Sequence, residues 1–199
     1  MRRGTEVGRA ERAHLASGAK LDPQRAALVV IDIQEGFRKA IPPFEQLARA
    51  ARTLVQGAEV VGIPIVVTEQ YPKGLGHTVP EVADHLPEGV EPIDKVCFSA
   101  VEADGFDLGD ADQALVCGGE THVCVNQTVL DLLALGIDVH VAEDAVGSRS
   151  KQNWQLGLHK VERAGAILTS VETALFELVR RAGTDEFKRV QKLILEYAP

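Results

Sequence analysis

The sequence lacks features that define several classes of protein. It contains no uninterrupted apolar run of about 18 residues, the length that a membrane-spanning helix needs. Its three cysteines have no regular spacing, which argues against a disulfide framework and favours a reducing compartment. Basic residues number 21 against 29 acidic ones, and a nucleic-acid surface needs a basic face. These absences predict a cytoplasmic protein that binds a small molecule, with no nucleic-acid or membrane partner.

The length and composition predict a single folded domain. With 199 residues, of which 45% are hydrophobic, the chain can bury one sizeable core. We expect residues 21–199 to form this domain. Residues 1–20 are polar and have no apolar centre, which predicts a disordered extension.

Short apolar runs rich in Val, Ile and Leu alternate with segments whose apolar residues recur at helical spacing. The runs predict strands at 26–33, 63–68, 113–117, 137–142 and 166–169. The other segments predict helices at 44–61, 121–135, 151–163, 171–180 and 184–197. Prolines and glycines at 68–92 predict a loop with at most one short helix.

The alternation of strand and helix determines the expected fold class. It predicts a three-layer α/β/α fold, in which helices cover both faces of a Rossmann-like, mainly parallel sheet of about six strands. Gly62, Gly136 and Gly165 follow three predicted helices, where a left-handed residue often ends a helix. Ligands of open parallel sheets bind beyond the carboxyl ends of the strands, so candidate site residues are expected there.

Asp32 ends an apolar strand, where a carboxylate is costly unless it is paired or used in chemistry. A functional carboxylate is one interpretation. A helix cap or a structural ion pair is the other, and position alone does not separate the two.

Cys124 follows a predicted strand and a Gly-Gly turn, so we expect it in the first turn of the next helix. Unpaired N–H groups and the helix dipole lower the pKa of a thiol at such a place, as a nucleophile requires. A lone cysteine is more often a small buried hydrophobic residue, and that interpretation fits Cys117 and Cys97 better.

A thiol nucleophile needs a base or a cation nearby. His122 is close in sequence, but residues two apart on a helix point in nearly opposite directions. We therefore expect the partners to come from other strand ends, with Asp32 as proton acceptor and Lys95 as positive charge. Lysine is usually a solvated surface residue, so spacing alone would not select Lys95.

The sequence contains no motif of several other site classes. It has neither G-x-G-x-x-G nor G-x-x-x-x-G-K-[ST] for nucleotide phosphates, and no G-x-S-x-G elbow. Its six histidines show no H-E-x-x-H or other tight metal-ligand spacing. We expect neither a metal nor a cofactor.

Three segments together resemble the isochorismatase-like family of cysteine hydrolases. They read LVVIDIQ at 28–34, DKVCFS at 94–99 and GGETHVCV at 118–125, with Gln127 and Thr128 following. Their order and spacing resemble the family over roughly residues 21–179. The segment TEQYPKGLGHT at 68–78 resembles the subgroup of isochorismatase-domain-containing proteins, whose substrates are mostly unassigned.

This resemblance implies a catalytic triad of Asp32, Lys95 and Cys124. It also implies a cis peptide bond between Gly119 and Glu120, and an oxyanion hole formed by the backbone N–H groups of Glu120 and Cys124. Strand-end position and the resemblance also suggest substrate-pocket residues, namely Gln34, Phe37, Glu69, Tyr71 and Ser99.

Two better-defined branches of the family fit less well. Nicotinamidases carry an Asp-x-His metal site where this chain has Glu69, Gln70 and Tyr71, so a metal-assisted reaction is not expected. Isochorismatase itself cleaves a vinyl ether without using the cysteine, so Cys124 argues against that reaction. The resemblance therefore implies a hydrolase that cleaves a small amide-like C–N bond through a covalent thioester. The alternative is a binding or scaffold protein that keeps the fold without turnover.

The sequence also bears on assembly. The family resemblance and the apolar residues at 171–179 and 187–194 predict a homo-oligomer, either a dimer or a tetramer.

Overall fold

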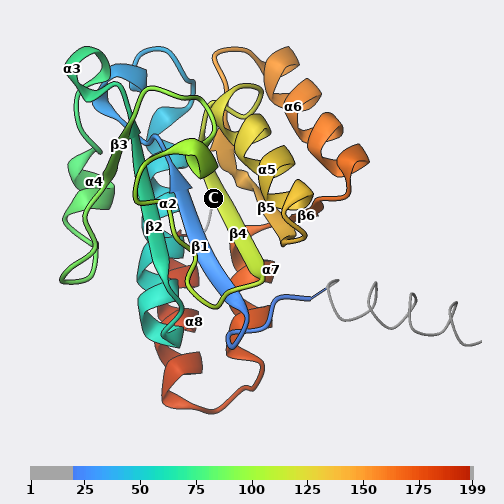
Figure 1. The fold of residues 1–199 in the computed structure, drawn as a ribbon. Helices are drawn as coiled ribbons and strands as arrows, with labels where there is room; N and C mark the ends of the chain where they lie inside the picture. The colour runs from blue at the N-terminus through green and yellow to red at the C-terminus, as the bar shows by residue number, and fades with distance from the viewer. Residues whose placement is uncertain (1–19, 198–199) are drawn as a thin grey trace, which may run out of the picture.

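The computed structural model describes residues 20–197, so the extension expected at 1–20 lies almost wholly outside the described residues. A six-stranded sheet with the order β3-β2-β1-β4-β5-β6 forms its centre, and every neighbouring pair of strands is parallel. Helices lie on both faces of this sheet (Figure 1). The predicted three-layer α/β/α fold is confirmed. No helix within residues 20–197 is long and apolar enough to cross a membrane.

The elements follow one another in the expected alternation. The strands are β1 (Ala26–Ile31), β2 (Ile65–Gln70), β3 (Ile93–Lys95), β4 (Gln113–Gly119), β5 (Asp138–Gly147) and β6 (Ile167–Thr169). The longer helices are α2 (Phe44–Val61), α5 (Cys124–Ala134), α6 (Lys151–Ala164), α7 (Val171–Val179) and α8 (Asp185–Tyr197). Short helical turns are η1 (Glu35–Phe37), α3 (Pro72–Leu75), α4 (Pro80–Ala83) and η2 (Ala100–Glu102).

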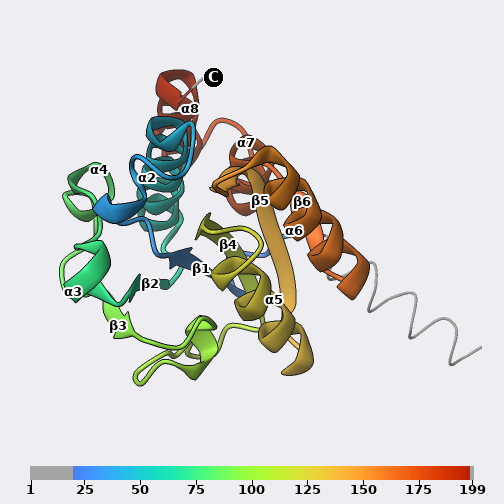
Figure 2. The same ribbon diagram turned by 90° about the horizontal axis from the view of Figure 1, so that it is seen from above.

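The central strand β1 shows how the two faces of the sheet are covered. Leu28 and Val30 pack into the cluster formed with α2, α7 and α8, whereas Val29 and Ile31 pack into the cluster formed with α5 and α6. Figure 2 shows α2 and α8 on one side of the sheet and α5 on the other. Because side chains alternate along a strand, one apolar run serves both cores and leaves its carboxyl end free for polar residues.

The helix α2 coincides with the segment predicted at 44–61. Its buried residues recur at helical spacing, and Gly62 ends it with a left-handed φ of 75°. The N–H of Gly62 bonds to the carbonyls of Ala58 and Glu59, which satisfies two of the last free acceptors of the helix. This agreement between pattern, cap and fold explains why the helix could be placed from sequence.

Several element boundaries differ from the prediction, and two of these differences lie beside the site. The strand β2 continues to Gln70 because β3 pairs with it over 68–70, and the loop that follows contains the two short helices α3 and α4 where one was expected at most. The helix α5 begins at Cys124 and not at Thr121. The N–H of Thr121 bonds to the carbonyl of Gly147, 2.8 Å away, so this residue continues the contact between strand ends and does not start the helix.

The apolar residues that suggested an oligomer are used within one chain. In α7, Val171, Leu175 and Leu178 are buried in the core that α2 shares with α7 and α8. In α8, Val190 is buried in the same core, and Phe187 contacts Phe176 with ring centroids 6.1 Å apart. These residues pack within one chain, so the homo-oligomer stays a prediction.

Candidate active site

Asp32 lies directly after β1, with a left-handed φ of 53° and no exposed surface. Its Oδ1 accepts a hydrogen bond from the Thr68 hydroxyl at 2.7 Å, and its Oδ2 accepts one from the Lys95 ammonium at 2.7 Å. Burial of an ionised carboxylate is costly unless it is paired and hydrogen-bonded, and both conditions hold here. The carboxylate is thus held in one orientation at the edge of the sheet.

Lys95 ends β3, and its side chain is wholly buried. Besides Asp32, its ammonium donates to the Gln70 Oε1 at 2.8 Å and faces the carbonyls of Cys97 and Phe98 at 3.3 and 3.2 Å. These oxygen atoms provide acceptors for all three protons of the ammonium. Lys95 is therefore buried, whereas most lysines lie at the surface.

Cys124 is the first residue of α5 and is 4% exposed. The Asp32 carboxylate and the Lys95 ammonium are close enough for their charges to act on its thiol. The structure therefore brings together three side chains from β1, β3 and α5. Asp32 is bonded to the Lys95 ammonium, and its charge also acts on the Cys124 thiol.

The pKa of the Cys124 thiol differs in direction from the expectation. Burial raises this pKa, the neighbouring Asp32 charge raises it further, and Lys95 lowers it only in part, so that it stands at about 12. The start of a helix was expected to favour the thiolate, but desolvation and a carboxylate outweigh that effect. The raised pKa makes the resting side chain a neutral thiol beside the Asp32 carboxylate.

The turn between β4 and α5 presents backbone N–H groups beside the thiol. The peptide bond between Gly119 and Glu120 is cis. Within residues 20–197, neither the N–H of Glu120 nor that of Cys124 donates a hydrogen bond to a protein acceptor. Gly118 has a φ of 134°, and a Cβ there would collide with the carbonyl of Ile31. Close contact with β1 therefore requires glycine at this point and fixes the path of the turn.

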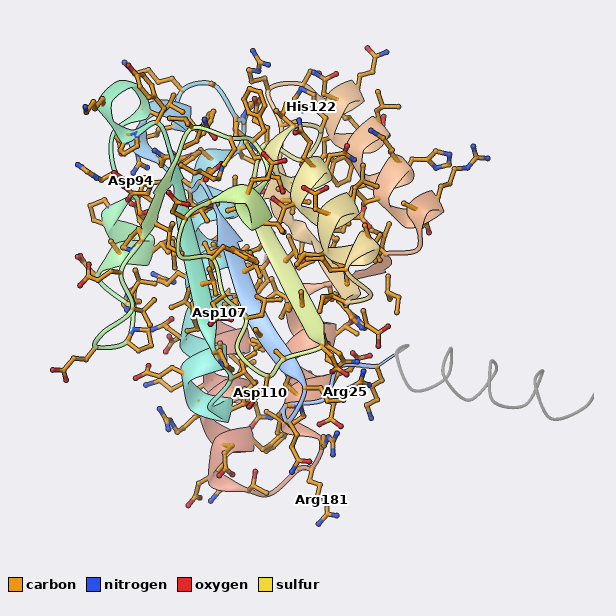
Figure 3. All side chains as sticks on the ribbon, viewed as in Figure 1. Arg25, Asp94, Asp107, Asp110, His122 and Arg181 are labelled. Atoms are coloured by element: carbon orange, nitrogen blue, oxygen red, sulfur yellow. The ribbon has the colours of Figure 1, made fainter. Side chains whose placement is uncertain are left out.

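His122 lies in this turn and not in the helix, so the helical argument against it used the wrong boundary. Its Nδ1 lies 3.0 Å from the Ser148 hydroxyl. Figure 3 places His122 above α5, at the same end of the molecule as Asp94, whereas Arg25 lies at the opposite end. In the part of the chain that the structure describes, His122 bonds to Ser148, and the Asp32 carboxylate acts on the thiol.

Two of the five pocket candidates are bound to the loop that follows β2. The Gln34 amide donates to the carbonyls of Gln70 and Gly76 and accepts from the N–H of Gln70. Glu69 accepts from the N–H and hydroxyl of Thr78 at 2.6 and 2.7 Å, and from His77 at 2.9 Å. These contacts occupy both side chains and fix the loop beside the site.

The other three candidates differ in exposure. Phe37 packs against the core below α2 and is half-buried. The Tyr71 ring is 54% exposed, although its N–H bonds to the carbonyl of Lys95 at 2.8 Å. Ser99 is 1% exposed, and its hydroxyl has no hydrogen-bond partner among the described residues. A buried hydroxyl without a protein partner is unusual.

The electrostatics around Glu69 differ from those around Asp32. Burial alone would raise the pKa of Glu69, but the hydrogen bonds from Thr78 and His77 outweigh it and lower the pKa. The same contact with Glu69 raises the pKa of His77. Among the described residues, no three His, Cys, Asp or Glu side chains gather in an arrangement that could hold a metal ion.

Sequence reasoning missed Thr68 and Gln70, which bond to Asp32 and Lys95. Both are buried, and both lie on β2 in alternate positions on the same face. Polar residues at 68–70 directly after an apolar run were a usable signal. The predicted end of β2 at Thr68 hid it, because the last two residues were assigned to a loop.

With this geometry in view, comparison with known proteins decides the family. The model of the Isochorismatase domain family matches residues 26–173. The chain belongs to the isochorismatase family. Membership supports a hydrolase at the level of the family and confirms the resemblance inferred from the motifs.

Individual relatives cover nearly the whole chain. Isochorismatase domain-containing protein 2A from Mus musculus is 40% identical over 92% of this chain and 89% of its own length. The secreted isochorismatase effector Isc1 from Phytophthora sojae is also 40% identical, over 89% of this chain and 88% of its own. Because one relative is described as secreted, a cytoplasmic location stays a prediction for this chain.

Among solved structures, one described as the MAR1 ribonuclease from Caenorhabditis elegans is similar to this chain. It shares 42% sequence identity and a TM-score of 0.85, covering 91% of this chain and 95% of that one.

Proposed function

We propose that the protein is a cysteine hydrolase that cleaves the C–N bond of a small amide-like substrate through a covalent thioester. The observation that carries this proposal is the buried contact of Asp32 with both Lys95 and Cys124. Apolar side chains of similar size would fill the same space without the cost of burying two charges. An ion pair aimed at a thiol is therefore better explained by chemistry than by stability.

In the first half-reaction, Asp32 accepts the thiol proton while the Cys124 sulfur bonds to the substrate carbonyl carbon. The carbonyl electron pair moves to oxygen, and the free N–H groups of Glu120 and Cys124 stabilise the oxyanion. When the carbonyl re-forms, the C–N bond breaks and protonated Asp32 gives its proton to the leaving nitrogen. An amine departs and an acyl thioester remains on Cys124.

In the second half-reaction, Asp32 accepts a proton from water as the water oxygen attacks the thioester carbon. The same N–H groups stabilise the second oxyanion. The C–S bond then breaks, the thiolate recovers the proton from Asp32, and a carboxylic acid leaves. Lys95 stays beside Asp32 throughout and balances the charge of its ionised form.

The raised thiol pKa supports a proton acceptor in the mechanism. With a pKa of about 12, hardly any thiolate exists at neutral pH, so the proton has to leave as the carbonyl is attacked. We propose that the neighbouring Asp32 carboxylate takes it. Cys124 therefore needs a neighbouring base, unlike a cysteine that is already a thiolate at neutral pH.

The charge of the site favours an uncharged substrate. Lys95 is already neutralised by Asp32, and the chain as a whole carries a formal charge of -8. Binding of a polyanion such as RNA relies on many basic contacts with phosphates. We therefore do not extend the ribonuclease activity named for the similar structure to this chain. RNA serves as one arm of the test.

Ser99 and Tyr71 are the residues that we propose contact the substrate. The Ser99 hydroxyl is buried without a partner, and Tyr71 presents an exposed ring beside the Lys95 backbone. The hydroxyl can bond to the carbonyl or amide of a substrate, while the ring can cover its apolar part.

The test is a screen of small amides, ureides and carbamates, with RNA as a separate arm and mass detection of an acyl adduct. Cys124→Ala should abolish both adduct and turnover. Cys117→Ala is the matched control, because Cys117 is also buried but packs in the core on the other face of the sheet from Cys124. Turnover that survives Cys124→Ala, or cleavage of RNA alone, would reject the proposal.

The rival proposal is a scaffold protein that retains the fold without turnover. It predicts that no member of the panel forms an adduct. It also predicts that Asp32→Asn changes the free energy of unfolding as much as the substitution of other buried polar residues does. The contact between Asp32 and the thiol argues against it. A homo-oligomer also stays a proposal, tested by light scattering against the chain mass of 21.4 kDa.

A further inference from the structure

A pocket of about 390 Å³ opens beside the candidate active site, between the start of α2 and the start of α6. It is lined by Ile41, Pro42, Pro43, Gln46, Leu47, Glu143, Asp144, Val146, Gly147, Ser148, Lys151 and Trp154. None of the three residues of the proposed mechanism belongs to this lining. Its volume falls within the range of about 300–1,000 Å³ that small-molecule sites occupy.

The body of the pocket is apolar and contains the single tryptophan of the chain. Ile41 and Leu47 are buried, and a Cβ on Gly147 would lie 2.7 Å from Ile41 and 3.1 Å from Leu47. The glycine thus allows both side chains to pack directly against β5. These apolar walls and the indole ring suit the body of a compact organic molecule.

The charged groups of the lining indicate which ligand the pocket selects. The Asp144 carboxylate accepts from the N–H of Val171 and the hydroxyl of Tyr197, both at 2.9 Å. Glu143 is exposed and makes no hydrogen bond or ion pair with any residue in 20–197. Lys151 supplies one positive charge against these two carboxylates. The free acceptor of the pocket is therefore Glu143, in surroundings of net negative charge.

We propose that this pocket is a second small-molecule site, which binds a compact apolar or aromatic amine with its ammonium at Glu143 and its body against Trp154. The site is separate from the proposed hydrolysis but shares a wall with it. The carbonyl of Gly147 accepts from the N–H of Thr121, and Ser148 contacts His122 at 3.0 Å, so the pocket rests on the turn that precedes Cys124.

The test uses tryptophan fluorescence, because Trp154 reports on this pocket without any turnover. The full chain is titrated with 2-phenylethylamine, with 2-phenylethanol as the uncharged analogue and 3-phenylpropionate as the anionic one. We expect a saturable change with the amine and at least about tenfold weaker binding of both analogues, since loss of one charge-assisted hydrogen bond is worth that much.

Three variants locate the site. Glu143→Gln should weaken amine binding about tenfold and leave the alcohol unchanged. Glu162→Gln, an exposed glutamate of α6 outside the pocket, should bind like the parent chain. Cys124→Ala should also bind the amine like the parent chain, because Cys124 does not line the pocket. The test of the pocket is therefore independent of the hydrolase proposal. No saturable response, equal binding of amine and alcohol, preference for the carboxylate, or no effect of Glu143→Gln would each overturn the proposal.

Discussion

Two buried carboxylates lie near the carboxyl ends of neighbouring strands, and their surroundings differ. Asp32, after β1, bonds to an ammonium and a hydroxyl, and its charge acts on a thiol. Glu69, on β2, bonds only to Thr78 and His77 in the loop that follows its strand. The first carboxylate lies beside a thiol whose proton it accepts in the proposed mechanism, and the second holds a loop in place. Burial of an acid at a strand end is therefore not enough to identify a catalytic group.

The largest expected effect separates the roles of the two carboxylates. Asp32→Asn should lower turnover by about 10²- to 10⁴-fold, because it removes the proton acceptor. Glu69→Gln should leave turnover within a few-fold, because the amide oxygen can still accept from Thr78. The turnover of both variants is measured as a steady-state rate with a substrate found in the screen. Equal losses for the two variants would contradict the comparison.

The same Asp32→Asn change should move thiol acidity in the opposite direction. Asp32 raises the pKa of Cys124 above its usual value, so its removal lowers this pKa and speeds alkylation by iodoacetamide at neutral pH. Slower turnover together with faster alkylation is the expected signature of a lost base. If alkylation also slowed, a general disruption of the site would explain the loss of turnover.

Next in size is the stability of the ion pair. Lys95→Met leaves the Asp32 charge buried without its partner, which should cost about 3–5 kcal/mol in urea unfolding. The double variant with Asp32→Asn should recover part of this loss, because no charge is then left unpaired. Lys192→Met, on the surface of α8, is the control and should change stability by less than about 0.5 kcal/mol. A Lys95→Met variant as stable as that control would show that the pair contributes little.

The smallest expected effect concerns pH and the Glu69–His77 contact. The lowered pKa of Glu69 contributes stability above its unfolded value of about 4.5, which is lost as pH falls. The raised pKa of His77 contributes stability below its unfolded value of about 6.5, which is lost as pH rises. The urea midpoints of the parent and His77→Gln should therefore differ most between these two values. A difference that stays constant up to alkaline pH would show that the contact is not ionic.

Sequence reasoning placed the fold and the positions of the chemistry better than it placed the contacts. The apolar pattern and Gly62 located α2, and the Gly-Gly turn located Cys124 at the start of α5. The direction of the thiol pKa was wrong, because burial and a charge from a distant segment decide it. Sequence spacing contains no information on either quantity.

The same limit applies to the pocket residues. Gln34 and Glu69 stand at strand ends, as substrate-binding residues often do, yet hydrogen bonds to the loop occupy both. Those bonds exist because the chain turns back after β2 and brings Gly76 and Thr78 beside β1. The return depends on the path of a loop whose helices were not foreseen. Which polar side chains remain free for a ligand therefore had to come from the structure.

The most direct test of the account is acid-quench mass spectrometry during turnover of a substrate from the amide panel. The account predicts an acyl group on the peptide that contains Cys124, present in the parent chain and in Glu69→Gln and absent in Cys124→Ala. Asp32→Asn should form this adduct far more slowly. An adduct on another residue, or full turnover with no adduct in any variant under conditions that preserve thioesters, would contradict the claim that Asp32 and Cys124 act together.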